Sequence, residues 1–258
     1  MIKGLGPHWR ITLGGAVLCL GAWQWVASAG PRPDHVLGPW QIALAWWHWL
    51  DSPKAWSALA ASLQRALLGF LIGGGLGLLL GLWAGVSRVF RDLFDWTQAM
   101  THPMPKIALF PVVAVVLGFT DVSRVLVIAL SAFYPAYLNA VNGALGVNPR
   151  LFWVARNAGA GRLRMFWQVL LPASLPRALV GLRIALMVSF VLMVATEVVG
   201  TSNGLGSALM KSYREGEYGA MYAGILSVAL CGMLANAALG WLGRRLVSWQ
   251  AVQGAGHV

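Results

Sequence analysis

Long apolar runs separated by short polar stretches dominate this sequence. Five runs predict helices over residues 11–29, 59–86, 124–145, 177–200 and 218–242, each able to cross a bilayer core of about 30 Å. A sixth run, 107–119, reaches only about 20 Å as a helix, so it crosses only if residues 94–106 continue it. The pattern therefore predicts an all-α, polytopic membrane protein with six transmembrane helices.

Composition supports this class and excludes others. The chain has 58% hydrophobic and 10% charged residues, which is unlike a soluble domain. Its net charge is +11, but the basic residues are scattered between apolar runs, so they indicate membrane topology and no nucleic-acid partner. No metal site is expected, because Cys19, Cys231 and the histidines lack ligand spacing. A P-loop is absent, so this chain is not expected to bind or hydrolyse ATP alone.

Residues 1–56 predict one transmembrane helix followed by a segment on the outer surface. Ala27-Ser28-Ala29 could be a signal-peptide cleavage site, but Trp23, Trp25 and the length of the run favour a retained helix. The following segment is rich in tryptophan, which favours a helix lying along the membrane surface. A stacking site for a sugar or base is the alternative, and it lacks polar partners. These tryptophans are Trp40, Trp46, Trp47, Trp49 and Trp56.

Glycine repeats at four-residue spacing in the run 59–86. The repeat gives one helix face without side chains, which lets another backbone approach closely. This helix is therefore predicted to be central in the bundle. The glycines are Gly69, Gly73, Gly77, Gly81 and Gly85.

Residues 148–172, which we call the basic loop, carry four arginines and no acidic residue. Such charge predicts a cytoplasmic location. Asn148 can cap a short helix over residues 149–158, Pro149 suits its first turn, and Gly159 suits its end. A second short helix is expected after Gly161, with Pro172 and Pro176 interrupting or redirecting it.

The motifs ARNAGAG and VLLPASLP in and after this loop resemble the EAA loop of ATP-binding cassette importer permeases. The resemblance implies a type I importer permease-like fold, a coupling helix that rests on a separate ATPase, and Trp153 where the family has glutamate. A loop that only contacts anionic lipid headgroups is the alternative. The implied ATPase-coupling residues are Arg150, Trp153, Ala155, Arg156, Asn157, Ala158, Gly159, Arg162 and Pro172.

Candidates for a substrate pathway lie in the later apolar runs. Lys106 follows two prolines, and HPMPKIALFPVVAVVLGF resembles a stretch of nitrate, sulfonate and taurine importer permeases. Lys106 could instead reach the cytoplasmic surface, Asn139 and Asn142 could bond to a neighbouring helix, and Glu197 could hold the outer turn Gly204-Leu205-Gly206. The full candidate set is Pro103, Pro105, Lys106, Tyr134, Asn139, Asn142, Arg183 and Glu197.

Charge counting predicts cytoplasmic termini, because ten basic residues fall in the expected inner segments against five in the outer ones.

The chain is predicted to have three parts: an N-terminal helix and outer segment over 1–56, a permease core over 57–245, and a cytoplasmic tail over 246–258. The resemblance implies a bacterial inner-membrane homodimer in contact with lipid, with two ATPases that hold ATP and Mg²⁺ and an extracytoplasmic binding protein.

The solute implied by the resemblance is a small anion such as nitrate, a sulfonate or taurine. A pyrimidine or an aromatic acid is the alternative within the family. An ion-coupled secondary transporter usually shows internal repeats, and none is found in this sequence. A membrane-embedded enzyme would need a convergent nucleophile, acid and base, and only Glu197 stands out.

Overall fold

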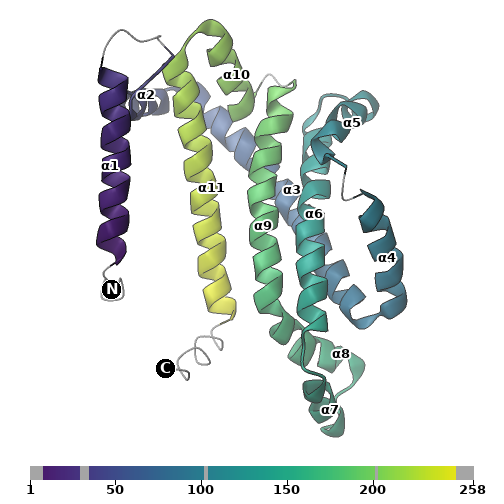
Figure 1. Cartoon of the computed structure of the whole chain (residues 1–258). Coiled ribbons are helices and arrows are strands. Elements are labelled where there is room, and N and C mark those ends of the chain that lie inside the picture. The colour runs from purple at the N-terminus through teal and green to yellow at the C-terminus, as the bar shows by residue number, and fades with distance from the viewer. Residues whose placement is uncertain (1–7, 30–34, 102–103, 201–202, 248–258) are drawn as a thin grey trace.

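A computed structural model of the chain describes residues 8–29, 35–101, 104–200 and 203–247, and all regular structure in these ranges is helical. Five of the described helices are long and apolar enough to cross a membrane. Figure 1 shows four of them, α3, α6, α9 and α11, packed as a bundle, with α1 standing beside it. The predicted all-α membrane fold is confirmed. The five long helices are α1 (His8–Ser28), α3 (Pro53–Val86), α6 (Asp121–Leu145), α9 (Leu171–Val198) and α11 (Tyr218–Leu246).

The sixth expected helix is broken into pieces. Its parts are α4 (Arg88–Thr101), the 3₁₀ turn η1 (Lys106–Leu109) and α5 (Phe110–Leu117). Pro105, just before η1, has an extended backbone with ψ 103°, and proline offers no N–H to continue a helix. Gly118, with φ +77°, then ends α5. The predicted count of six transmembrane helices is therefore not confirmed: five described helices are long enough to span, and the segment predicted to be interrupted by prolines is in pieces.

The glycine face of α3 packs directly on α6. A Cβ atom built on Gly77 would lie 2.5 Å from the carbonyl oxygen of Phe133, and one on Gly81 would lie 2.5 Å from that of Tyr137. A Cβ on Gly73 would overlap the backbone of Ala129. Only glycine allows this approach, which replaces the hydrophobic effect with van der Waals contact inside a membrane. The predicted central position of this helix is confirmed, because α3 contacts α6 most extensively and α9 next.

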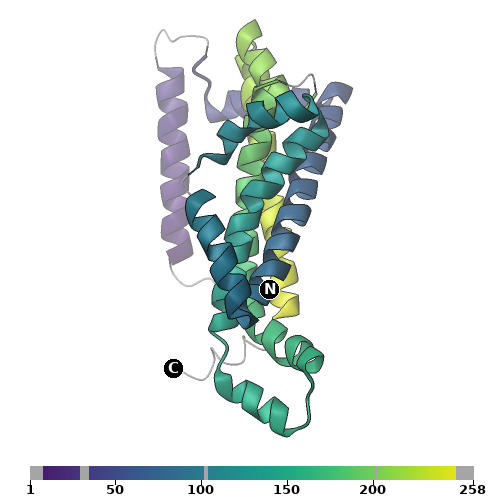
Figure 2. The ribbon, with the colours of Figure 1, turned by 90° about the vertical axis from the view of Figure 1, so that its right-hand side faces the viewer.

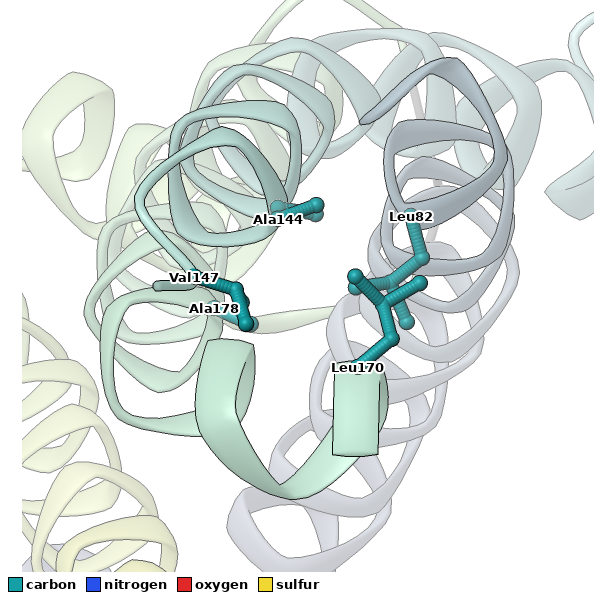
Figure 3. Close-up of a cluster of buried hydrophobic side chains, with 6 residues drawn as sticks. Leu82, Ala144, Val147, Leu170 and Ala178 are labelled. Atoms are coloured by element: carbon teal, nitrogen blue, oxygen red, sulfur yellow. The ribbon is translucent and has the colours of Figure 1, made fainter. Parts of the chain in front are cut away.

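A cluster of buried side chains ties α3, α6 and the start of α9 together beside the basic loop (Figure 3). Phe152 and Phe166, which belong to the loop, pack against this cluster. These two contacts therefore hold the loop against the end of the bundle. The buried members are Leu82, Ala140, Ala144, Val147, Leu170 and Ala178.

The N-terminal elements lie at the edge of the bundle. The short helix α2 (Pro39–Leu50) fulfils the prediction of a tryptophan-rich helix after the first span, and Trp46 Nε1 donates to Ser227 Oγ of α11 at 3.0 Å. In α1, the Gln24 side chain accepts a hydrogen bond from the backbone N–H of Trp40 at 3.1 Å. Most other side chains of α1 are exposed, as expected for a helix in lipid.

The two ends of the bundle differ in shape. At one end, the basic-loop end, α7 (Pro149–Asn157) and α8 (Arg162–Met165) project beyond the long helices (Figures 1 and 2). At the other, which we call the α10 end, lie α2 and α10 (Leu205–Glu215). The start of α1 and the end of α11 are both at the basic-loop end.

Candidate functional site

The helix of the basic loop begins and ends as its sequence predicts. The Asn148 side chain accepts a hydrogen bond from the Arg150 N–H at 3.0 Å, and Pro149 occupies the first turn. Gly159 has φ +77°, a left-handed conformation that side chains disfavour. The helix α7 ends at Asn157, one residue before the predicted limit. The local geometry of the loop is therefore set by its own residues.

The prolines do not interrupt the second helix of the loop, so of the two predicted outcomes only a change of helix direction stays open. The described chain is helical from α8 through the π-helical segment η2 (Phe166–Leu170) into α9. Pro172 is the second residue of α9, directly after η2, and Pro176 lies inside α9. A π-helical turn has wider hydrogen-bond spacing than an α-helix, so the bonding pattern changes just before the proline, which has no N–H to donate. The loop is thus joined to the transmembrane helix α9 through continuous helical structure.

Large apolar side chains project from the basic loop. The exposed fractions of Trp153, Val154 and Leu163 are 65%, 68% and 74%. Arg150, Arg156, Arg162 and Arg164 belong to the same loop and are exposed, and they form no ion pair within the described residues. Exposed large apolar side chains together with arginines are typical of a protein-binding surface.

The predicted coupling residues lie in α7, in α8 and in the turn between them, except Pro172, which lies at the start of α9. Ala155, Ala158 and Pro172 line an apolar groove of about 470 Å³ between α7 and the start of α9. Trp153, Asn157 and Gly159 are exposed at its surface. Charge and apolar surface are therefore available for a partner here.

Three of the predicted pathway residues meet in a second groove. Lys106, Tyr134 and Asn139 line a cavity of about 480 Å³ between η1, α6 and α9. Lys106 Nζ lies 5.7 Å from the centre of the Tyr134 ring, within the range of a cation–π contact. The Asn139 amide donates to the carbonyl oxygen of Pro135 at 2.9 Å. Among the described residues that line this groove there is no carboxylate, and Lys106 is the one charged group.

The other pathway candidates lie elsewhere. Asn142 is exposed outside the groove, and its carbonyl oxygen accepts a hydrogen bond from Arg177 at 3.3 Å. Arg183 lies in a different groove against α11. Pro105 is exposed and precedes η1, whereas Pro103 falls outside the described residues. Asn142 and Arg183, which the sequence placed with Lys106 in one pathway, therefore lie outside its groove in the fold.

Glu197 lies at the α10 end, fully buried among hydrogen-bond donors. Its carboxylate accepts from Arg65 Nη1 at 2.6 Å, from Ser62 Oγ at 2.7 Å and from the Gly206 N–H at 2.9 Å. A Cβ on Gly204, where φ is +131°, would lie 2.5 Å from the Glu197 carboxyl carbon. The glycine-rich turn thus closes over this carboxylate.

Two further charges complete what we call the Glu197 network, made of Ser62, Arg65, Asp121, Arg124 and Glu197. Arg65 Nε donates to Asp121 Oδ1 at 2.8 Å, and Arg124 Nη1 donates to the same oxygen at 3.3 Å. Both guanidinium side chains are buried. The network joins α3, α6 and α9 to the start of α10.

Sequence reasoning missed Arg65 because it treated residues 59–86 as one apolar run. The available signal was an arginine in an otherwise apolar helix together with a glutamate in another, since charges inside a membrane pair with one another. Which of the several charges Glu197 would meet depended on the packing of α3 against α9.

The comparisons with known proteins agree on one family. Residues 77–248 match the family model described as "Binding-protein-dependent transport system inner membrane component". The chain is 35% identical over 229 residues to "Putative aliphatic sulfonates transport permease protein SsuC" of Bacillus subtilis (strain 168), covering 88% of this chain and 83% of that protein.

Two more relatives carry different names. "Taurine transport system permease protein TauC" of Escherichia coli (strain K12) is 30% identical over 249 residues, or 93% of this chain and 89% of that protein. "Nitrate import permease protein NrtB" of Leptolyngbya laminosa is 30% identical over 235 residues, or 88% and 84%. A solved structure titled as inward facing conformations of the MetNI methionine ABC transporter has the same fold, with TM-score 0.55 and 21% identity, covering 81% of this chain and 97% of that one.

Proposed function

From the premise that this chain belongs to the family of binding-protein-dependent transport system inner membrane components, we propose that it forms a passage for a small anion. The chain is a permease subunit of an ATP-binding cassette importer, a multi-pass inner-membrane protein without enzymatic activity. The family implies separate ATPase and substrate-binding protein partners. ATP and Mg²⁺ would be held by the ATPases and not by this chain.

The observation that carries the proposal is the groove of Lys106. A lysine in a low-dielectric setting is costly unless it faces water, and where it does so it attracts anions. Tyr134 and Asn139 add polar groups beside it, and no acidic residue is found in the part of the lining that the structure describes. The relatives named for aliphatic sulfonates and nitrate agree with an anionic solute.

We assign each partner to one of the two ends of the bundle. Two ATPases would bind the exposed surface around Trp153, with an indole contact in place of the acidic residue of the family pattern. A second copy of the chain would complete the passage, with lipid around the pair. The extracytoplasmic binding protein would approach the α10 end.

Membrane orientation is proposed from charge. The basic loop and the last turn of α11 are rich in arginine, so the positive-inside rule assigns this end to the cytoplasm. Both termini are then cytoplasmic, because α1 begins and α11 ends at the same end of the bundle.

The substitution Lys106→Gln tests the passage in complexes reconstituted with saturating binding protein. Uptake of an anionic substrate should fall about tenfold, which corresponds to losing about 1.4 kcal/mol of attraction, while ATP hydrolysis persists. Arg88→Gln, which removes an exposed charge at the start of α4 outside the groove, is the matched control. Unchanged uptake with Lys106→Gln, or an equal loss for a neutral substrate, would reject an electrostatic role for Lys106.

A further inference from the structure

A groove of about 390 Å³ lies between α9 and α11 at the basic-loop end, away from the residues used above. Its walls are mostly apolar, and its two charged members are Arg183 and Arg244, both exposed. Arg183 is therefore on a different face of α9 from Ile184 and Val188, which line the groove of Lys106. The remaining lining residues are Pro176, Leu179, Val180, Gly243 and Val247.

The two guanidinium groups gather at one glycine. A Cβ on Gly240 would lie 3.1 Å from Arg183 Nη2 and 3.8 Å from Arg244 Nη1. The absence of a side chain at this position lets both arginines lie over α11. Two like charges brought to one place repel each other, and an anion between them relieves that repulsion.

None of the described residues offers an anion to these two arginines. Neither arginine forms an ion pair or a hydrogen bond within the described residues. The sequence carries no aspartate or glutamate from residue 122 to 196 and none after Glu217, so neither α11 nor the segment after it can supply a carboxylate side chain. The carboxylates of α4 and of the α10 end do not line the groove. Within the described residues nothing supplies a counter-charge, so the two arginines are open to an anion from another molecule.

We propose that this groove binds the headgroup of an anionic phospholipid from the leaflet at the basic-loop end. Guanidinium groups pair with phosphate through two parallel hydrogen bonds, and the apolar walls formed by Leu179 and Val180 suit the first carbons of acyl chains. Basic pockets between transmembrane helices are suited to such headgroups. Next to the groove, Arg245 stacks over the Trp241 ring at 5.3 Å, a pairing typical of the membrane interface.

A lipid titration on the purified importer complex tests the site. Thermal melting is followed in micelles doped with dioleoylphosphatidylglycerol, with dioleoylphosphatidylcholine, or supplemented with inorganic phosphate. The anionic lipid should raise the melting temperature of the wild type, and the other two additives should not. Arg183→Gln and Arg244→Gln should each raise the lipid concentration needed about fivefold, which corresponds to about 1 kcal/mol per arginine.

Two further variants keep the test decisive. Arg245→Gln removes the same charge from the neighbouring position outside the groove and should leave the titration unchanged. Gly240→Leu keeps every charge but fills the place of the guanidinium groups, so it should weaken the lipid effect as the arginine variants do. An equal loss in Arg245→Gln, an unaltered titration in Gly240→Leu, or an equal shift with inorganic phosphate would overturn the proposal. The readout is binding, so it does not depend on which solute is transported.

Discussion

Charged residues are used in opposite ways at the two ends of this bundle. At the α10 end, Arg65, Arg124 and Glu197 are buried, and Arg65 donates to Glu197 at 2.6 Å while Arg124 donates to the carbonyl oxygen of Gly200 at 2.8 Å. At the basic-loop end, the arginines are exposed, and no carboxylate lies within the loop or near it in the sequence. The buried charges form most of their hydrogen bonds within the chain, with Arg124 Nε left unpaired, whereas the exposed charges are open to water and to a partner.

The difference indicates what each end is for. A buried ion pair fixes the positions of the helices that supply it, because moving one partner leaves the other unsatisfied in a low-dielectric setting. Exposed charges around apolar side chains contribute little to folding but suit the binding of a partner. We therefore expect changes at the α10 end to alter stability and changes at the basic-loop end to alter assembly.

Glu197→Ala should have the largest effect. It leaves the buried guanidinium of Arg65 and the hydroxyl of Ser62 without their carboxylate, so the free energy of unfolding should fall by about 3–5 kcal/mol. Denaturation of the purified chain in detergent measures the change. The paired variant Arg65→Met with Glu197→Leu removes both charges and should recover most of the loss. If the paired variant is no more stable than Glu197→Ala, the ion pair is not the source of the stability.

Trp153→Ala should leave stability unchanged and weaken assembly. Aromatic side chains at the centre of an interface commonly contribute about 2 kcal/mol or more, so binding of the ATPase should weaken at least tenfold. Co-purification of the tagged permease with its ATPase measures this. Trp47→Ala is a matched control, since Trp47 has the same exposed fraction, 65%, but belongs to α2. Equal retention of the ATPase by both variants would show that Trp153 lies outside the interface.

Asp121→Asn should have the smallest effect and sharpens the contrast within the Glu197 network itself. Its side chain is 66% exposed although it accepts from both arginines, so water screens the pairs and the loss of stability should stay below about 1 kcal/mol. Raising the salt concentration should reduce the difference from wild type further. A loss as large as that of Glu197→Ala would mean that Asp121 is as important to the network as the buried glutamate.

Much of this architecture could be predicted from local pattern. The long apolar runs predicted α1, α3, α6, α9 and α11, although α3 begins six residues and α9 six residues before the predicted limits and α11 ends four residues later. The cap at Asn148 and the left-handed Gly159 depend on neighbours in sequence, so they were predictable as well. The glycine repeat of α3 indicated close packing because a repeat of four keeps one face of a helix bare.

Sequence by itself thus determined the class of the protein, the positions of most helices and the charge of the basic loop, because these depend on residues within a few turns of one another. Tertiary structure alone decided which distant groups meet. In the structure Glu197 pairs with Arg65 of α3, and Lys106 lies beside Tyr134. Arg183 lies in the groove against α11 and not in the groove of Lys106. Such meetings depend on how helices far apart in the chain rotate and cross, and hydrophobic spacing specifies a helix face without naming the neighbour that will cover it.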